Sequence, residues 1–273
     1  MTRFDLVVIG AGPAGMAAAV TAREAGLSVL LVDEQPEPGG QIWRAVERNK
    51  RDRPANLSFL GEDYAAGAVL AGRFRSCGAE YWPSAMVWHL DCPEKGDKSV
   101  VVARNGGTEQ VAAGQVLIAS GAMERPVPVP GWTLPGVMTI GAAQTVLKSS
   151  GLYPDAPLVL AGSGPLLLLF AAQCAAAHIP VSAILDTTPS GAPGRGLPHL
   201  PRAMLGWRTL LKGRKLLRAM KQSGVPVYRD VRDIAAIGEE AVERVRFTSG
   251  GESHELPAAS LLLHEGVVPN PQL

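Results

Sequence analysis

The sequence predicts an α/β protein with two Rossmann-like strand–helix–strand units joined by a proline-rich connector. Two of the three observations behind this prediction are glycine-rich turns, at 10–15 and 162–167, each lying between a buried apolar run and a helix-forming run. The third is the stretch 126–135, where four prolines exclude a helix or a central strand. At 273 residues the chain is long enough for two domains.

The composition excludes several classes of protein. With 47% hydrophobic and 19% charged residues, the chain is typical of a globular protein and not of a disordered or coiled-coil one. The formal net charge of +1 gives no overall field that would attract nucleic acid or an anionic membrane, so any basic patch is local. No apolar run has the length of a signal sequence or a membrane span, and we expect a cytoplasmic protein.

Cysteine and histidine spacing predicts no metal site. Cys77, Cys92 and Cys174 form no C-x-x-C or C-x-C pair, which argues against a disulfide framework, a zinc site, an iron–sulfur cluster and a redox-active dithiol. No histidine has a metal-ligand neighbour four residues further on, and we interpret the histidines as structural. They are His89, His178, His199, His254 and His264.

The first unit begins with a buried strand at Leu6–Ile9, followed by a helix at Ala14–Ala25 and a second buried strand at Val29–Val32. In the turn between the first strand and the helix, Gly10 permits a tight turn and Gly12 lets backbone N–H groups approach a pyrophosphate. A third glycine lets the helix pack closely on the sheet, and the helix N-terminus favours a phosphate. The residues predicted to bind a dinucleotide here are Gly10, Gly12, Pro13, Ala14 and Gly15.

An acidic pair ends the second strand. Asp33 is predicted to accept hydrogen bonds from an adenosine ribose, and Glu34 stands beside it. The glycine pair in 38–43 follows, where backbone could run along the dinucleotide or simply form a surface turn. Short strands are predicted at 85–90 and 100–104, and a buried strand at 116–120 ends on a glycine. Further predicted contacts from these segments are Gly40, Gln41, Val87, Ser120 and Gly121.

The second unit repeats the pattern, with a strand from Leu158, a helix at 166–177 and a strand at 181–185. Its predicted nucleotide contacts are Gly162, Gly164, Pro165, Leu166 and Asp186. Leu167 departs from the pattern, because it occupies the position of the third glycine and either moves the helix from the strand or alters the mouth of the site. The candidates for this site are NAD, another adenine nucleotide or no ligand; an acid at 186 favours NAD over NADP.

These observations divide the chain into a first domain at 1–125, a connector at 126–153 and a second domain at 154–273. The order of a βαβ unit, a β meander and a closing strand resembles the two-dinucleotide-binding flavoproteins typified by glutathione and thioredoxin reductases. In that fold the first site holds FAD. The connector motif Glu-Arg-Pro-x-Pro-x-Pro-Gly-Trp-Thr-Leu-Pro-Gly-Val at 124–137 narrows the resemblance, together with 141–144 and the ending at 263–270.

Across nearly its whole length the chain resembles FAD-dependent A subunits of opine oxidases, the similar subunit of hydrogen cyanide synthase and the alpha subunits of dye-linked proline or hydroxyproline dehydrogenases. The resemblance implies an FAD-binding oxidoreductase subunit that works with a substrate-oxidising flavoprotein subunit, and with a small iron–sulfur subunit in many relatives. It implies no acid or base residue, so the catalytic residues stay unknown. It also implies that the chain returns to the FAD domain after the second unit, with a Gly-Asp at the flavin. That return is expected beyond residue 273 or from another polypeptide.

A local basic face lies between Thr187 and Arg229, where nine lysines and arginines occur without an acid. Within it, 201–224 reads as an amphipathic helix. Its candidate roles are docking a partner, contacting anionic lipid at the inner face of the membrane, bordering a nucleotide phosphate, or forming an ordinary solvated face. The basic residues are Arg195, Arg202, Arg208, Lys212, Arg214, Lys215, Arg218, Lys221 and Arg229.

Two other functions stay open beside the flavoprotein subunit. One is a stand-alone NAD(P)H-dependent flavin reductase of the thioredoxin-reductase kind, which the absent C-x-x-C motif and Leu167 disfavour. The other is a non-catalytic assembly subunit in which the second site holds a structural adenine nucleotide.

Overall fold

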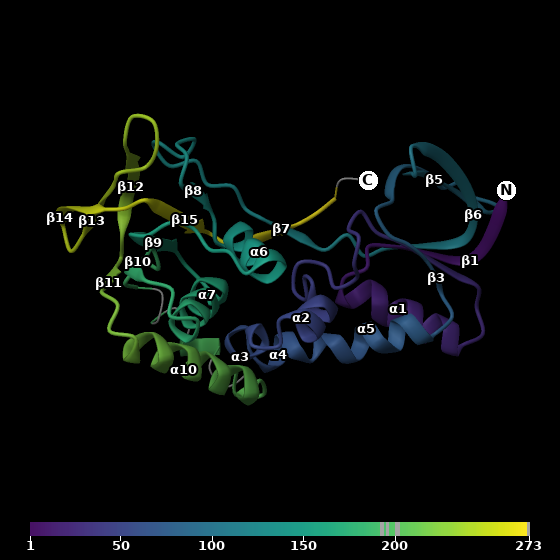
Figure 1. Ribbon diagram of the computed structural model, residues 1–273, viewed down its shortest axis with the longest axis horizontal. Coiled ribbons are helices and arrows are strands. Elements are labelled where there is room, and N and C mark those ends of the chain that lie inside the picture. The colour runs from purple at the N-terminus through teal and green to yellow at the C-terminus, as the bar shows by residue number, and fades with distance from the viewer. Residues whose placement is uncertain (192–193, 195–196, 200–202, 272–273) are drawn as a thin grey trace. The chain divides into compact units, whose positions relative to one another are not determined.

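The structure, a computed structural model, describes the chain except residues 192–193, 195–196, 200–202 and 272–273. It divides into two compact units (Figure 1). The first comprises Met1–Met123 and Pro269–Leu273, and the second comprises Glu124–Val268. Each unit is built on its own sheet.

The first unit contains a six-stranded sheet in the order β3-β2-β1-β6-β5-β4. The first four strands in this order run parallel, and β5 and β4 continue the sheet antiparallel. The strands are β1 (Thr2–Ile9), β2 (Val29–Val32), β3 (Glu80–Trp82), β4 (Met86–Asp91), β5 (Lys98–Arg104) and β6 (Gly107–Ile118). Ile9 pairs with Val32 on one side and with Ile118 on the other, so the carboxyl ends of three strands meet at one edge.

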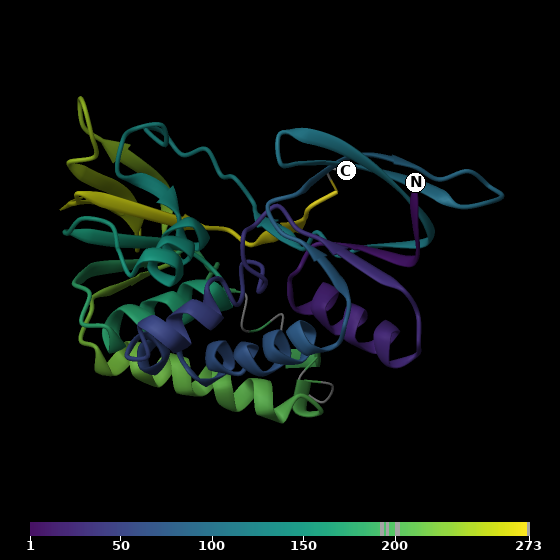
Figure 2. The ribbon, with the colours of Figure 1, turned by 45° about the vertical axis from the view of Figure 1, so that its right-hand side comes forward.

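Helix α1 packs on β1 and β2, and α1 and α5 lie side by side in both ribbon views (Figures 1 and 2). The helices are α1 (Pro13–Glu24), α2 (Val46–Asp52), α3 (Asn56–Leu60), α4 (Glu62–Ala65) and α5 (Gly67–Ser76). Alanines make α1 a strong helix former and leave its inner face small enough to pack closely on the strands. Side chains from β1, β2 and β5 form a hydrophobic core. It contains Val7, Leu30, Val32, Val100 and Val102, all at most 1% exposed.

The second unit repeats the parallel arrangement in a five-stranded sheet, β11-β10-β9-β15-β8. Its strands are β8 (Val137–Thr139), β9 (Leu158–Gly162), β10 (Val181–Asp186), β11 (Val227–Arg229) and β15 (Ser260–His264). The helices are α6 (Ile140–Ser150), α7 (Pro165–Ala176) and α10 (Trp207–Gln222), with a short 3-10 turn η1 (Leu197–His199). Every residue of β9 is buried, as its uninterrupted apolar sequence predicts for a parallel strand covered on both faces.

Two smaller sheets complete the chain. Strands β12 (Arg232–Ile237), β13 (Arg244–Ser249) and β14 (Glu252–Pro257) form an antiparallel meander whose apolar side chains join the core of the second unit. Strands β7 (Ala122–Glu124) and β16 (Val267–Pro269) form a two-stranded sheet. No helix in the described part of the chain has the length and apolar character needed to cross a membrane.

The observed units differ from the predicted boundaries at two places. The stretch 126–153, expected to be a connector, contains β8 and α6 and belongs to the second unit, because β8 pairs with β15. Its proline-rich first part, 126–136, and its last residues, 151–153, lie outside helices and strands. Residues from 269 belong to the first unit and not to the second, because the backbone N–H of Asn270 donates to the carbonyl oxygen of Gly121 at 3.0 Å.

Most predicted strands and helices agree with the observed ones within four residues, except for one helix and one strand. The helix expected at 201–224 is α10, and 200–202, with Arg202, lie outside the described residues, as does Arg195. The strand expected at 116–120 is the end of a longer strand, β6, which stops at Ile118.

Candidate nucleotide-binding sites

The first glycine turn has the close contacts that require glycine. A Cβ on Gly15 would lie 1.8 Å from the carbonyl oxygen of Gly10, so α1 begins directly against the turn. Gly10 itself has a φ of 105°, and a Cβ there would lie 2.4 Å from the carbonyl oxygen of Ala119. Gly12 differs from both, because its nearest neighbour would be the Cα of Gly40 at 4.0 Å. The space beside Gly12 is therefore open.

The glycine pair at 39–40 lies against this turn. The backbone N–H of Gly39 donates to the carbonyl oxygen of Ala11 at 2.8 Å, and a Cβ on Gly40 would lie 2.9 Å from the Cα of Gly12. The side chain of Gln41 donates to the carbonyl oxygen of Ala122 at 3.3 Å. The structure thus brings three of the predicted contact segments together: the turn, the glycine pair and the end of the closing strand.

Asp33 is held by the backbone of its own unit. One carboxylate oxygen accepts a hydrogen bond from the N–H of Ala11, and the other accepts one from the N–H of Gln35 at 2.7 Å. Its neighbour Glu34 is exposed and has no side-chain partner among the described residues. Asp33 therefore fixes the glycine turn to the end of β2, while Glu34 keeps a free carboxylate at the same edge.

The remaining predicted residues of the first site lie in three places. Ser120 and Gly121 follow β6, whose end is joined to β1 by the Ala119 N–H and the carbonyl oxygen of Ile9 at 2.8 Å. The hydroxyl of Ser120 donates to the carbonyl oxygen of Asn270 at 2.7 Å. Val87 is 9% exposed and its side chain packs in the core of the unit. Pro13 and Ala14 are the first residues of α1, so the N-terminus of that helix begins at the turn.

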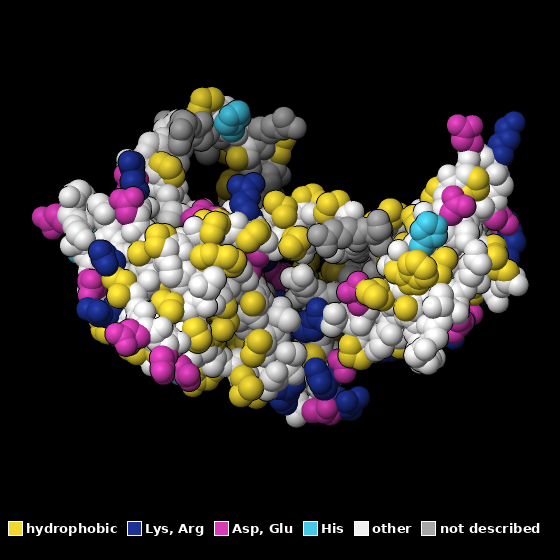
Figure 3. Space-filling view, turned by 90° about the horizontal axis from the view of Figure 1, so that it is seen from above, with side chains coloured by type: hydrophobic (Ala, Val, Ile, Leu, Met, Phe, Trp, Pro, Cys, Tyr) yellow, Lys and Arg dark blue, Asp and Glu magenta, His cyan; other side chains and the backbone are white. Residues whose placement is uncertain are grey.

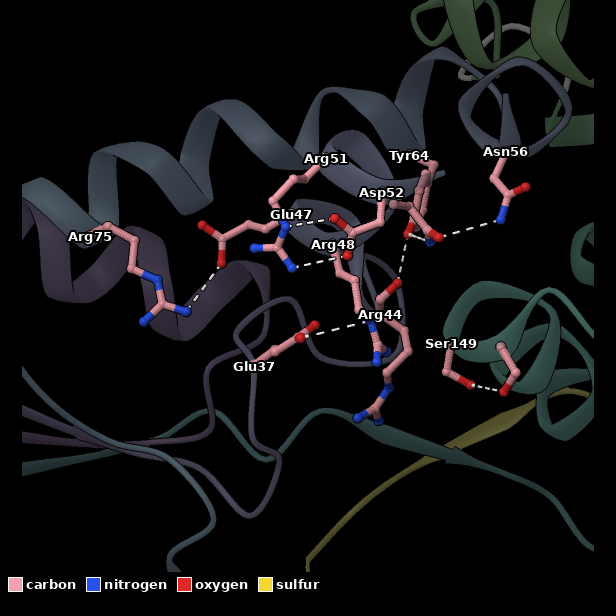
Figure 4. Close-up of polar contacts among 12 residues, drawn as sticks. Glu37, Arg44, Glu47, Arg48, Arg51, Asp52, Asn56, Tyr64, Arg75 and Ser149 are labelled. Carbon is pink, nitrogen blue, oxygen red and sulfur yellow. Dashed lines mark hydrogen bonds and ion pairs between the residues drawn. The ribbon is translucent and has the colours of Figure 1, made fainter. Parts of the chain in front are cut away.

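Two arginines that we did not single out from the sequence lie in the segment after the glycine pair (Figure 4). Arg44 donates to the side-chain oxygen of Gln35, and Arg48 forms an ion pair with Glu37 at 3.7 Å. The Nε atoms of both arginines are buried without a hydrogen-bond partner. The available signal was their position, since Arg44 directly follows the stretch 38–43.

The second glycine turn is built on the end of β15. A Cβ on Gly162 would lie 1.8 Å from the carbonyl oxygen of His264, which also accepts a hydrogen bond from the N–H of Ser163 at 2.9 Å. Gly164 has a φ of 92° and is exposed, and Pro165 is the first residue of α7. Leu166 is half-buried. Leu167, at the position of the third glycine, is 2% exposed, so the helix accommodates a full side chain where α1 accommodates none.

Acidic side chains surround the second turn. Glu265 accepts hydrogen bonds from the hydroxyls of Ser163 at 3.2 Å and Thr187 at 2.6 Å. Asp186 accepts one from the N–H of Thr188 at 2.9 Å. The carboxylate of Glu265 therefore places negative charge directly beside the turn.

A pocket of about 390 Å³ opens beside this turn. Its lining is mostly apolar, with one acid and one base, Asp186 and Arg229, which are paired in register on β10 and β11. Arg229 is a further residue whose place we did not predict, since the sequence showed it only as the end of a basic run. The lining consists of Gly164, Pro165, Leu167, Leu168, Ile184, Asp186, Thr188, Leu217, Met220, Val227 and Arg229.

The described residues contain no group of three or more histidines, cysteines, aspartates or glutamates placed to hold a metal ion. The buried thiol of Cys174 has its pKa raised to about 12 by desolvation, so it is neither a nucleophile nor a ligand at neutral pH. The chemistry of both sites therefore depends on glycine backbone, helix N-termini and single charged side chains, which together suit a nucleotide.

Comparison with known proteins shows to which family the chain belongs. Residues 4–273 match the family described as pyridine nucleotide-disulphide oxidoreductase. The chain belongs to this family. Solved structures with the same fold include thioredoxin reductase of T. acidophilum, with a TM-score of 0.66 and 16% identity over 100% of this chain and 80% of that one. L-proline dehydrogenase of P. horikoshii has a TM-score of 0.63 and 17% identity over 98% of this chain and 43% of that one.

Closer relatives are found by sequence. The A subunit of opine oxidase from Agrobacterium tumefaciens is 46% identical over 99% of this chain and 54% of its own length. The HcnB subunit of hydrogen cyanide synthase from Pseudomonas protegens is 31% identical over 98% of this chain and 57% of its own length. The alpha subunit of sarcosine oxidase from Rhizobium meliloti is 32% identical over 80% of this chain and 22% of its own length. The chain spans about half the length of the first two relatives.

These findings confirm the resemblance, the two-unit α/β fold and FAD as the cofactor expected for it. In this structure the residues around the first turn fit such a group, because Gly12 and Gly40 leave backbone open to a pyrophosphate at the start of α1.

Proposed function

We propose that this chain is the FAD-binding part of an oxidoreductase subunit that takes part in oxidation of an amino acid, an opine or a proline derivative. The observation that carries the proposal is the packing of the Gly40 backbone on Gly12 at the N-terminus of α1. This geometry leaves N–H groups free to bind a pyrophosphate and excludes side chains from its path. Bound FAD would supply the redox chemistry, while the protein supplies position and charge.

Individual residues have separate roles in this proposal. Gly10, Gly12 and Gly15 shape the turn, and Gly40 and Gln41 form the second wall beside it. Glu34 binds the adenosine ribose, because its carboxylate is exposed whereas both oxygens of Asp33 accept backbone N–H groups. Arg44 and Arg48 neutralise charge around the adenosine half. Ser120 and Gly121 lie at the flavin end of the site.

The substrate class comes from the relatives, which are subunits of opine oxidase, hydrogen cyanide synthase and sarcosine oxidase. We propose a partner flavoprotein subunit that oxidises the substrate, and a small iron–sulfur subunit is the further component we propose. The chain passes electrons on to an acceptor. No residue of this chain is proposed as the acid or base of the substrate reaction.

We propose an adenine nucleotide as the ligand of the second site. The pocket combines an apolar lining for a base with Asp186 for ribose hydroxyls and Arg229 for a phosphate. Leu167 and the Glu265 carboxylate beside the turn disfavour a pyrophosphate stretched across it, as a bound NAD would require. A nucleotide held here by its adenosine end fits these side chains better than a complete dinucleotide does.

The decisive experiment co-expresses the chain with its candidate partner and measures flavin content and dye reduction by amino acids, opines and NADH. We expect FAD at the first site and turnover with an amino acid or opine only in the complex. NADH-driven dye reduction by the chain alone would favour the stand-alone flavin reductase, and absence of any flavin would favour the non-catalytic assembly subunit.

A further inference from the structure

One helix of the second unit carries charge and apolar surface that the nucleotide sites do not use. Helix α10 contains six cations, and the chain from 188 to 228 contains no acid. None of its residues is buried. The cations are Arg208, Lys212, Arg214, Lys215, Arg218 and Lys221.

The two faces of α10 differ. Gly213, Leu216, Ala219 and Met220 are half-buried, and the helix contacts α7. At 100° per residue these positions form one face, and the opposite face starts at Trp207 and continues through Leu211, Arg214 and Arg218. The outward stripe is therefore apolar in its first half and basic in its second.

The apolar half is strongly exposed. Trp207 is 56% exposed and Leu211 is 54% exposed, and Leu205 just before the helix is 85% exposed. Large apolar side chains grouped in this way are unusual on a free surface and indicate a contact. Because the charged residues of α10 are all positive, the surface that complements them is negative.

We propose that α10 and the residues just before it dock on an anionic lipid surface. In this arrangement Trp207 and Leu211 enter the boundary between headgroups and acyl chains, and Arg214 and Arg218 contact lipid phosphates. Lysine supplies three of the six cations. Lysine is depleted from protein interfaces, whereas it is common on the polar face of interfacial helices, and this favours lipid over an acidic protein.

The test is co-sedimentation of the chain with vesicles of phosphatidylcholine, with and without phosphatidylglycerol. We expect binding only to the vesicles with phosphatidylglycerol, weakening as salt is raised. Trp207→Ser combined with Leu211→Ser should lower the partition coefficient at least tenfold, and so should Arg214→Gln combined with Arg218→Gln, on the order of 1 kcal/mol per cation.

The matched control removes two charges elsewhere on the second unit. Arg232→Gln with Arg244→Gln, at side chains 69% and 52% exposed, should leave vesicle binding unchanged. Thermal unfolding of each variant separates loss of binding from loss of fold. Absence of binding to the phosphatidylglycerol vesicles would overturn the proposal, and so would equal losses in the control and α10 variants. Capture of an acidic protein by α10 without vesicle binding would also overturn it and would make α10 a protein-docking helix.

Discussion

Gly12 and Gly15 are three residues apart in the same turn but have different neighbours. A side chain at Gly15 would enter the carbonyl of Gly10, whereas one at Gly12 would enter open space beside Gly40. We expect Gly15→Val to lower the free energy of unfolding by ~1–3 kcal/mol, the usual range for overpacking. Gly12→Val should leave the free energy of unfolding nearly unchanged and abolish FAD retention. Chemical denaturation and flavin absorbance distinguish the two; retention of FAD by Gly12→Val would contradict the assignment of the turn.

The two acids at the end of β2 are also expected to have different roles, Glu34 in FAD binding and Asp33 in the stability of the fold. Glu34→Gln should weaken FAD binding by roughly tenfold, the effect of a lost hydrogen bond to a charged acceptor, without changing stability. Asp33→Ala leaves the N–H groups of Ala11 and Gln35 without their acceptor and should lower the free energy of unfolding by about 1–3 kcal/mol. FAD titration and urea unfolding of both variants provide the check. An affinity loss in Asp33→Ala without a stability change, together with normal affinity in Glu34→Gln, would return the ribose role to Asp33.

The three cysteines should react with a thiol reagent in order of their exposure. Cys92 is exposed, Cys77 is half-buried, and Cys174 is buried with a pKa raised to about 12. Because the thiolate is the reactive form, Cys174 should stay unlabelled in the native protein between pH 7 and 9, whereas Cys92 should label rapidly. Labelling followed by peptide mass spectrometry measures this. Rapid modification of Cys174 under native conditions would show that α7 is not packed as described.

At the scale of elements, a buried acid joins three parts of the second unit. Glu124, at the end of β7, accepts the backbone N–H of Gly141 at 2.7 Å and contacts the Nδ1 of His264 at 2.6 Å. The side chains of His264 and Glu124 are only 4% and 10% exposed. The pair therefore connects the end of β7, the N-terminus of α6 and the end of β15, beside the second glycine turn.

Removing one member of this buried pair should be costly. Glu124→Ala leaves His264 and the Gly141 N–H without this partner, and we expect a loss of about 1–3 kcal/mol in the free energy of unfolding for each buried polar group left unpaired. The double variant with His264→Ala should lose less than the sum of the two single variants, because the residues interact. Additive losses in a denaturation series would mean that the contact contributes nothing to stability.

At the scale of the molecule, the two units have separate sheets and separate cores. A ligand that binds one folded unit stabilises that unit by mass action. We expect FAD to slow hydrogen exchange in the first unit, at the glycine turn and the segment 39–48, and ADP added to the FAD-saturated protein to slow it further around β10 and β11. Exchange measured by mass spectrometry with FAD alone and then with both ligands checks this. No added protection of β10 and β11 by ADP would contradict a second nucleotide site there.

Charge at this scale is balanced except at one helix. On the face drawn in Figure 3, acidic and basic side chains are interspersed, as expected from a net charge of +1. The six cations of α10 are the exception, and they form a local field that the total charge does not reveal. Composition alone could exclude a global attraction to membranes but could not locate this surface.

Local signals in the sequence were sufficient for the glycine turns and for the strands and helices around them, but not for elements such as α2–α6, β8 or β12–β14. A strand such as β9 is marked by an unbroken apolar run, and a turn such as 10–15 by glycines whose conformations other residues avoid. Both depend on neighbours a few residues away. The family resemblance also followed from the sequence, since the connector motif is a continuous stretch. Together they predicted the fold, FAD as the cofactor and the two glycine turns before any contact was known.

Long-range contacts were decided only by the tertiary structure. The sequence did not show that both oxygens of Asp33 accept backbone N–H groups while Glu34 stays exposed, because this depends on which N–H groups each carboxylate reaches after folding. Nor could it show that 126–153 joins the second unit, because the pairing of β8 with β15 connects residues more than a hundred positions apart. Arg229 enters the pocket for the same reason, since register between β10 and β11 sets its place beside Asp186. Turns and periodicity are local properties of a chain, whereas partners and pockets are formed when distant segments pack together.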